Sequence, residues 1–232
     1  MADNVLVTGA NRGIGLELVR QHAAAGWRVY ACCRQPERAV ELNRLAAGGR
    51  GQVSVHPLDV TNAGQIAALP AILGGQPLER LINNAGIYGQ DDAGFGNTDV
   101  RAWLETFHVN SIAPLKIMEA LLEQVARSRR RVMACVSSKM GSMADNRSGG
   151  SYVYRSSKAA LNAVVMSAAV DLRRRGIVVV ALNPGWVKTD MGGPNAEITT
   201  AESVGALRAI LDRLGPVDSG RFIDVDGTTI PW

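Results

Sequence analysis

The chain alternates short runs of apolar, often β-branched residues with longer stretches of helical periodicity. The short runs predict strands at 5–8, 28–32, 53–56, 80–83, 131–136, 177–182 and 222–225. The helical stretches lie at about 14–25, 36–47, 100–127 and 152–174, with a weaker one broken by Gly64 and Pro70. Pro114 falls inside the longest helical stretch, where proline bends a helix. Strands that alternate with helices predict right-handed crossovers and a parallel sheet.

The length of 232 residues suits one α/β domain, so residues 1–232 are expected to carry every binding site. The longest apolar runs, such as 177–182, are far shorter than the roughly 20 residues of a membrane span. The first residues do not pair a basic stretch with an apolar one, which gives no indication of a signal peptide. The default expectations are therefore a cytoplasmic protein and no membrane partner.

The net charge of +4 comes mainly from arginines, which gather at 127–131 and 173–175. Both clusters end a helical stretch, where cations complement the helix dipole. Because no aromatic interleaving accompanies them, no nucleic-acid partner is expected. Cys32, Cys33 and Cys135 lie in strand runs and are odd in number, which does not describe a disulfide framework or a metal site.

A glycine-rich segment joins the first strand to the first helix, with the sequence TGANRGIG at 8–15. Gly9 permits a sharp turn, Gly13 lets the backbone approach a pyrophosphate, and Gly15 allows the helix to pack closely on the strand. The N–H groups at the start of a helix favour phosphate. A purely structural turn is the alternative, but the position in a βαβ unit favours a dinucleotide.

The end of the second strand indicates which dinucleotide is preferred. NAD sites of this kind place an acid about 20 residues after the glycine turn, whereas this chain has Arg34 there. Arg34 and Arg12 suit a 2′-phosphate, so NADP(H) is expected to be preferred over NAD(H); ordinary surface arginines are the alternative. Asp59 is placed to accept a hydrogen bond from adenine, or else to cap the next helix, alone or with Thr61.

Tyr154 and Lys158 are four residues apart in a helical stretch, which places them on one face one turn apart. A free tyrosine has a pKa near 10, and a nearby cation lowers the pKa of a phenol. The pair therefore forms a sensible acid–base device, although Tyr154 could instead pack under the helix while Lys158 points to water. Tyr152 does not share this geometry, because Ser156 occupies its i+4 position.

Polar residues end several of the expected strands. Ser138 follows the fifth strand, where its hydroxyl could hold a substrate oxygen beside Tyr154. The segments 83–86 and 183–189 end the fourth and sixth strands, and Asn110 is a polar amide inside the long helical stretch. The carboxyl ends of parallel strands share one edge, which predicts a single site there.

The motifs TGANRGIG, LDVT, NNAG, YRSSK and NPGWVKT, together with the Ser138 region, occur in the order typical of the short-chain dehydrogenase/reductase superfamily. The sequence resembles this superfamily over essentially its whole length. The resemblance implies a three-layer, doubly wound Rossmann fold with a seven-stranded parallel sheet of order 3-2-1-4-5-6-7, flanked by helices.

The resemblance also implies a catalytic tetrad of Asn110, Ser138, Tyr154 and Lys158. Tyr154 would be the general acid in reduction, Ser138 would position the carbonyl, and Asn110 would hold a water that links Lys158 to solvent. Together with the motifs, it implies that the cofactor is bound by Gly9, Asn11, Arg12, Gly13, Ile14, Gly15, Arg34, Asp59, Val60, Asn84, Ala85, Gly86, Tyr154, Lys158, Pro184, Gly185, Val187 and Thr189.

Within the superfamily, segments 184–195 and 220–232 resemble the C-factor and sniffer-like carbonyl reductases. The implied function is NADP(H)-dependent interconversion of a small carbonyl compound and its alcohol, by a homodimer or homotetramer. The alternative is a nucleotide-binding signalling or regulatory protein of C-factor type with low turnover. Lys139 departs from the usual apolar residue, and either favours an acidic substrate or faces water. Candidate pocket residues, which could instead be packing residues, are Tyr88, Phe95, Met140, Met143, Trp186 and Met191.

Overall fold

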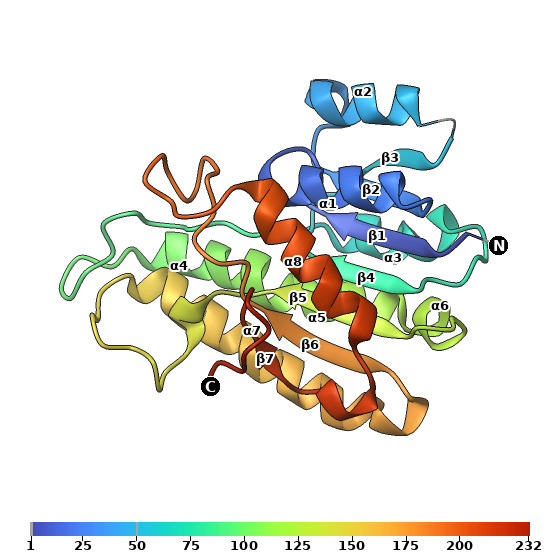
Figure 1. Ribbon diagram of the computed structural model, residues 1–232. Coiled ribbons are helices and arrows are strands. Elements are labelled where there is room, and N and C mark those ends of the chain that lie inside the picture. The colour runs from blue at the N-terminus through green and yellow to red at the C-terminus, as the bar shows by residue number, and fades with distance from the viewer. Residues whose placement is uncertain (1, 50) are drawn as a thin grey trace.

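The computed structural model describes residues 2–49 and 51–232 and contains a seven-stranded parallel sheet (Figure 1). The sheet order is β3-β2-β1-β4-β5-β6-β7, as expected. The strands are β1 (Asn4–Thr8), β2 (Arg28–Cys33), β3 (Val53–Pro57), β4 (Arg80–Asn83), β5 (Val132–Val136), β6 (Val178–Leu182) and β7 (Phe222–Ile223). Strands β2 and β3 lie on one side of β1, and β4 to β7 lie on its other side. The strand order therefore switches between β1 and β4, and doubly wound folds bind their ligands at such a switch point.

Helices cover both faces of the sheet (Figure 1). They are α1 (Gly13–Ala24), α2 (Val40–Gly48), α3 (Ala63–Ile72), α4 (Val100–Phe107), α5 (Ala113–Ala120), α6 (Leu122–Ala126), α7 (Tyr152–Leu172) and α8 (Thr200–Arg213). Val5 and Val7 of β1 pack with α1, α2 and α8, whereas Leu6 between them packs with α3, α5 and α7. Since successive residues of a strand point to opposite faces, both faces of β1 are apolar.

Helix α8 was not among the helical stretches expected from the sequence. Its start carries a capping box: Glu202 N donates to Thr199 Oγ1 over 3.2 Å, and Thr199 N donates to Glu202 Oε2 over 2.8 Å. Val204, Leu207 and Leu211 then pack on the sheet. The capping pattern and the helical spacing are both present in the sequence and would have been sufficient to predict the helix.

The single helix expected at 100–127 is three helices. A π-helical turn, His108–Ile112, follows α4, and Pro114 lies in the first turn of α5, directly after this turn. A second break at Leu121 separates α5 from α6. Single π turns inside helices often occur at functional sites, and this one contains Asn110.

The arginines at 173–175 lie at a helix end, as expected, and form a 3₁₀ turn after α7 that stops at Gly176 with φ of 68°. The three cysteines are buried free thiols. Within residues 2–49 and 51–232, no helix is long and apolar enough for a membrane crossing. No group of three or more histidine, cysteine, aspartate and glutamate side chains in these same segments is arranged to hold a metal ion.

Candidate active site

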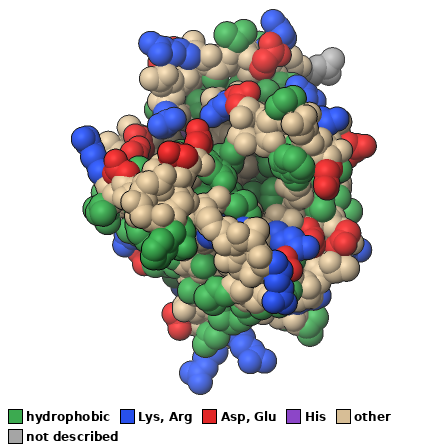
Figure 2. Space-filling view, turned by 90° about the vertical axis from the view of Figure 1, so that its left-hand side faces the viewer, with side chains coloured by type: hydrophobic (Ala, Val, Ile, Leu, Met, Phe, Trp, Pro, Cys, Tyr) green, Lys and Arg blue, Asp and Glu red, His purple; other side chains and the backbone are tan. Residues whose placement is uncertain are grey.

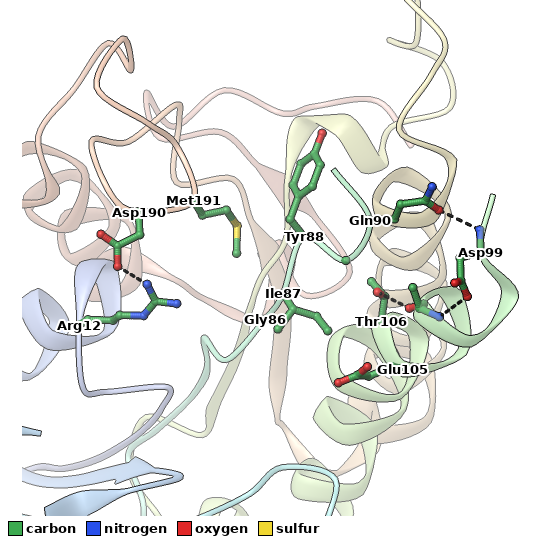
Figure 3. Close-up of a pocket in the computed structure, with 12 residues that line it drawn as sticks. Arg12, Gly86, Ile87, Tyr88, Gln90, Asp99, Glu105, Thr106, Asp190 and Met191 are labelled. Atoms are coloured by element: carbon green, nitrogen blue, oxygen red, sulfur yellow. Dashed lines mark hydrogen bonds and ion pairs between the residues drawn. The ribbon is translucent and has the colours of Figure 1, made fainter. Parts of the chain in front are cut away.

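A cleft of about 600 Å³ opens at the carboxyl edge of the sheet. The loops after β4, β5 and β6 all extend from this edge, at the left of Figure 1, and Figure 2 shows the same edge hollowed at its centre. The cleft is lined by Arg12, Gly86, Ile87, Tyr88, Gly89, Gln90, Asp99, Ala102, Glu105, Thr106, Asp190 and Met191, most of which Figure 3 labels.

The glycine turn borders the cleft and leaves no space for side chains. A Cβ at position 15 would lie 2.1 Å from the carbonyl oxygen of Gly9, and a Cβ at position 13 would lie 3.3 Å from Thr189 Cγ2. Gly9 and Gly13 have φ of 64° and 54°, which side chains disfavour. The side chain of Arg12, the N-cap residue of α1, does not cap that helix, so the first N–H groups remain available for an anion.

The end of β4 is tied to this turn. The side chain of Asn84 donates to the carbonyl oxygens of Thr8 and Gly9 over 2.9 and 3.2 Å. The backbone N–H groups of Asn84 and Ala85 both donate to Thr8 Oγ1 over 3.0 Å. The expected cofactor residues of β1 and β4 therefore form one continuous wall.

The structure places the other expected cofactor residues at different depths. Ile14 is partly buried and packs on the core, whereas Asn11 is exposed. Val60 instead lines a second cavity of about 460 Å³ that is formed by residues of α3, α5 and the π turn.

Asp59 does not cap α3, so that alternative was wrong. Its carboxylate accepts hydrogen bonds from the N–H and hydroxyl of Thr61 over 2.9 and 2.7 Å, and Asn62 caps the helix instead. The hydrogen bonds from Thr61 hold the pKa of Asp59 below its usual value, and the nearby Arg34 acts in the same direction. Arg34, which follows β2, and Asp59, which follows β3, therefore lie close together, with the carboxylate ionised.

Arg12 forms an ion pair with Asp190 at one side of the cleft, opposite Thr106 and Glu105 (Figure 3). Both side chains are largely exposed, and Asp190 lies in the loop after β6. An exposed pair of this kind contributes at most about 1 kcal/mol and is screened by salt. Arg12 is therefore held only weakly by the protein.

The loop after β6 folds back toward the glycine turn. Ser203 of α8 donates to the carbonyl oxygen of Pro184 over 2.6 Å, and Gly185 has φ of 79°. Val187 is buried and pairs with Ile198 in an isolated parallel bridge. Thr189 Oγ1 accepts a hydrogen bond from Gly192 N over 3.1 Å. These contacts order the loop that faces the first turn of α1.

Tyr154 and Lys158 lie on the buried face of α7. The Lys158 Nζ is 5.7 Å from the centre of the Tyr154 ring and donates to the carbonyl oxygen of Val136 over 2.9 Å. Burial lowers the pKa of Lys158 to about 8 and raises the pKa of Tyr154 to about 12, while Ser138 acts on the tyrosine in the opposite direction. The expectation that the nearby lysine would lower the pKa of Tyr154 is therefore not met, because desolvation by burial is the largest influence on the phenol.

Ser138 follows β5 and begins a 3₁₀ turn, Lys139–Gly141. Its hydroxyl accepts a hydrogen bond from Met140 N over 3.2 Å, and it lies close enough to Tyr154 to influence the pKa of the phenol. The side chain of Lys139 is half-exposed, and its Nζ is 3.6 Å from Asp145 Oδ2. Of the two interpretations of Lys139, the structure favours a side chain that faces water.

Asn110 lies in the π turn, with its amide satisfied by three hydrogen bonds. Its Oδ1 accepts from Ile87 N over 2.9 Å, and its Nδ2 donates to Ile87 O over 2.8 Å and to Ser157 Oγ over 3.0 Å. A Cβ at Gly86 would lie 3.3 Å from Asn110 Oδ1 and 3.5 Å from Lys158 Nζ. Gly86 thus leaves the space in which the side chains of Asn110 and Lys158 approach each other.

The expected pocket residues do not all reach the cleft. Tyr88 and Met191 line it, whereas Phe95 is 95% exposed and Met143 is 74% exposed. Met140 and Trp186 are not among the lining residues, and the Trp186 indole donates to Gly192 O over 2.8 Å. Sequence reasoning did not identify the lining residues Ile87, Gly89, Gln90, Asp99, Ala102, Glu105, Thr106 and Asp190. No motif marks them, because they reach the cleft only through the packing of α4 and the two loops.

Comparison with known proteins places these features in context. Residues 3–199 match the sequence model of the short chain dehydrogenase family. The C-signal protein of Myxococcus xanthus is 46% identical over 156 residues, which cover 67% of this chain and 93% of that protein.

Among solved structures, the NADPH-bound carbonyl reductase from chicken fatty liver has a TM-score of 0.93 and 37% identity, covering 100% of this chain and 99% of its own. The carbonyl reductase Sniffer of Drosophila melanogaster has a TM-score of 0.91 and 33% identity over the whole of both chains.

Proposed function

Because the chain belongs to the short-chain dehydrogenase/reductase family of oxidoreductases, we propose that it is an NADP(H)-dependent carbonyl reductase that uses Tyr154 as its proton donor. One observation carries the proposal: Tyr154 and Lys158 are buried side by side at the carboxyl edge of the sheet, close to Ser138. Such an arrangement can bind an oxygen and transfer a proton in a site from which water is largely excluded.

The residues present fit a dinucleotide phosphate. The side-chain-free turn of Gly9, Gly13 and Gly15 leaves room for a pyrophosphate over the first N–H groups of α1. Arg34, and Arg12 once released from Asp190, would bind the 2′-phosphate, and the position directly after β2 carries Arg34 instead of an acid. When bound, the reduced nicotinamide supplies the hydride for the carbonyl carbon.

The side chains of the chain itself would handle the substrate oxygen and the proton. Ser138 would donate a hydrogen bond to the carbonyl oxygen, and Tyr154 would transfer its phenolic proton to that oxygen. Lys158 Nζ has three N–H donors, of which one is bound to Val136 O, so the other two are available to a ribose hydroxyl and a water. Asn110 would hold that water, and with it a route for protons to solvent.

A Tyr154→Phe variant tests this assignment. Turnover should fall by about 10²- to 10⁴-fold because the proton donor is removed. NADPH affinity, measured by cofactor fluorescence, should be unchanged because the ring and its packing are kept. Tyr152→Phe on the same helix is the control and should remain active, since Tyr152 is partly exposed. Full turnover in Tyr154→Phe would refute the assignment.

A second function is favoured by the 46% identity to C-signal: a nucleotide-binding signalling or regulatory protein with low turnover. Assays of NADPH oxidation with a panel of aldehydes and ketones separate the two. Turnover with any of them supports the reductase, and tight NADPH binding with no turnover supports the signalling protein. We also propose a homodimer or homotetramer, which sedimentation equilibrium would reveal.

A further inference from the structure

A third buried polar residue continues the row formed by Tyr154 and Lys158. Asn162 lies one turn beyond Lys158 on α7, so the three side chains follow one another on the same face of the helix. The side chain is buried, with only 4% of the residue exposed. Buried amides are retained where their hydrogen bonds are satisfied, so the partners of Asn162 indicate what it holds in place.

Both partners of Asn162 belong to the segment that carries Ser138. Its Oδ1 accepts a hydrogen bond from Ser137 Oγ over 2.6 Å, and its Nδ2 donates to the carbonyl oxygen of Gly141 over 3.3 Å. Ser137 directly precedes Ser138, and Gly141 ends the 3₁₀ turn that Ser138 begins. One side chain of α7 therefore holds the segment on both sides of Ser138.

The contact at Gly141 shows how closely this segment lies on the helix. A Cβ at position 141 would be 2.8 Å from both the Cβ and the carbonyl carbon of Lys158. These distances leave no space for a side chain, so the backbone of the turn rests directly on α7. The position of Ser138 relative to Tyr154 thus depends on how this turn is attached to the helix.

A different amide holds the other side of the turn. Asn183, which follows β6, accepts a hydrogen bond from Lys139 N over 3.0 Å and donates to Asp224 Oδ1 over 2.7 Å. This contact fixes the peptide after Ser138 to the sheet, not to the helix that carries Tyr154. Arg155 of α7 also donates to the turn, at Met140 O over 3.3 Å, but it lies outside the Tyr154–Lys158 row. Among residues 2–49 and 51–232, Asn162 is the member of that row whose side chain bonds to both Ser137 and Gly141.

We propose that Asn162 is a positioning residue, which sets the distance between the Ser138 and Tyr154 hydroxyls so that both can bind one substrate oxygen. The inference rests on the proposed carbonyl reduction and assigns no direct contact with substrate to Asn162. Its amide is neutral, so it orders the segment without adding a charge beside Lys158. A misplacement of about 1 Å in such a site can cost about 10²-fold in rate.

Two variants separate positioning from a merely structural role. Asn162→Leu keeps a similar volume and removes both hydrogen bonds, and Ser137→Ala removes one of them from the other side. Ser128→Ala is the matched control, because Ser128 is also buried, flanks the opposite end of β5 and accepts one hydrogen bond, from Arg131 N over 3.0 Å.

In Asn162→Leu, we expect kcat for carbonyl reduction to fall by about 10- to 100-fold while the KM for NADPH changes by less than about twofold. The kcat of Ser137→Ala should also fall, but by a smaller factor. The double variant should be no slower than Asn162→Leu, because both changes break the same contact. Ser128→Ala should keep its kcat. An unchanged kcat in both site variants, an equal loss in the control, or additive losses would overturn the proposal.

Crystal structures of the variants provide a test that does not depend on activity. The Ser138 hydroxyl should move away from Tyr154 in Asn162→Leu, and in Ser137→Ala if the first variant fails to fold. An unchanged separation of the two hydroxyls would overturn the positioning role. A wild-type chain that reduces no carbonyl compound would refute the proposed function instead, and the crystal structures would still decide the role of Asn162.

Discussion

The ring of Tyr88 stacks on the ring of Tyr154, with centres 4.6 Å apart and planes inclined by 22°. The Tyr88 hydroxyl lies 2.9 Å from Ser151 Oγ. Ser151 directly precedes α7 and has φ of 46°, an uncommon backbone conformation for a residue other than glycine. Tyr88 therefore restrains the orientation of Tyr154 from the cleft side and contacts the segment that begins its helix.

Loss of the stacking between Tyr88 and Tyr154 should slow the reaction more than loss of the Tyr88 hydroxyl alone. A stacked aromatic pair contributes about 0.5–1.5 kcal/mol beyond its buried area, so Tyr88→Leu should lower kcat by up to about tenfold. Tyr88→Phe keeps the stack and should lose much less. Steady-state kinetics at saturating NADPH check both values. Equal kcat for the leucine and phenylalanine variants would show that the stack has no role.

Lys158 should destabilise the folded protein at neutral pH. Burial lowers its pKa from 10.5 to about 8, so between these values the unfolded chain binds a proton that the folded chain lacks. The loss of folding stability from burying this charge therefore has its full value below pH 8, and it disappears as the pH rises to 10.5. At 1.36 kcal/mol per unit it amounts to about 3 kcal/mol, partly offset by the bond to Val136.

Lys158→Met should therefore lose activity and gain stability at pH 7, with the gain smaller at pH 10. Urea denaturation of the variant and the wild type at both pH values measures the difference. Lys116→Met, at a half-exposed surface position, is the control and should show no such dependence on pH. A variant less stable than the wild type at pH 7 would contradict this account.

His22 should make the fold sensitive to acid. Its ring is completely buried, with Nδ1 2.8 Å from Leu18 O and Nε2 3.3 Å from an Arg80 nitrogen, which requires a neutral ring that accepts at Nε2. Burial lowers its pKa from 6.5 to about 4. Between these values only the unfolded chain takes up the proton, so stability present above pH 6.5 is lost as the pH falls to 4.

Between pH 6.5 and pH 4, His22 should lower the free energy of unfolding by about 3 kcal/mol. His22→Gln removes the titration, so its free energy of unfolding should fall less steeply between pH 7 and pH 4 than that of the wild type. Denaturant titrations across the range give both slopes. Parallel slopes would show that His22 is not the group responsible.

Arg34 should determine the cofactor preference. Arg34→Ala should raise the KM for NADPH far more than the KM for NADH, by about tenfold or more, because a charge-assisted contact with the 2′-phosphate is worth about 1.5–3 kcal/mol. Arg12→Ala should have the smaller effect, since Arg12 already has a partner in Asp190. Kinetics with both cofactors test this, and an equal rise for NADPH and NADH would refute it.

The strands and the main motifs could be predicted from the sequence, because they depend on local pattern. The order of the strands was expected from the resemblance to the short-chain dehydrogenase/reductase superfamily. Helix geometry places Tyr154 and Lys158 on one face of α7. Helix α8 could also have been predicted, because the capping box of Thr199 and Glu202 is recognisable in the sequence. The two breaks within 100–127 could not be predicted in this way, since a π turn depends on what its residues contact.

Tertiary structure alone decided how the site is assembled. The ion pair of Arg12 with Asp190 joins residues 178 positions apart, and the contact of Asn162 with Ser137 depends on how α7 packs against β5. The direction of the Tyr154 pKa shift was also out of reach, because it depends on how completely the fold removes the phenol from water. The sequence by itself indicated which residues to propose for the chemistry, since the spacing of Tyr154 and Lys158 is a local property and the motifs resemble those of the superfamily. Packing decided their distances, burial and proton affinity, since these depend on segments that meet only in the folded chain.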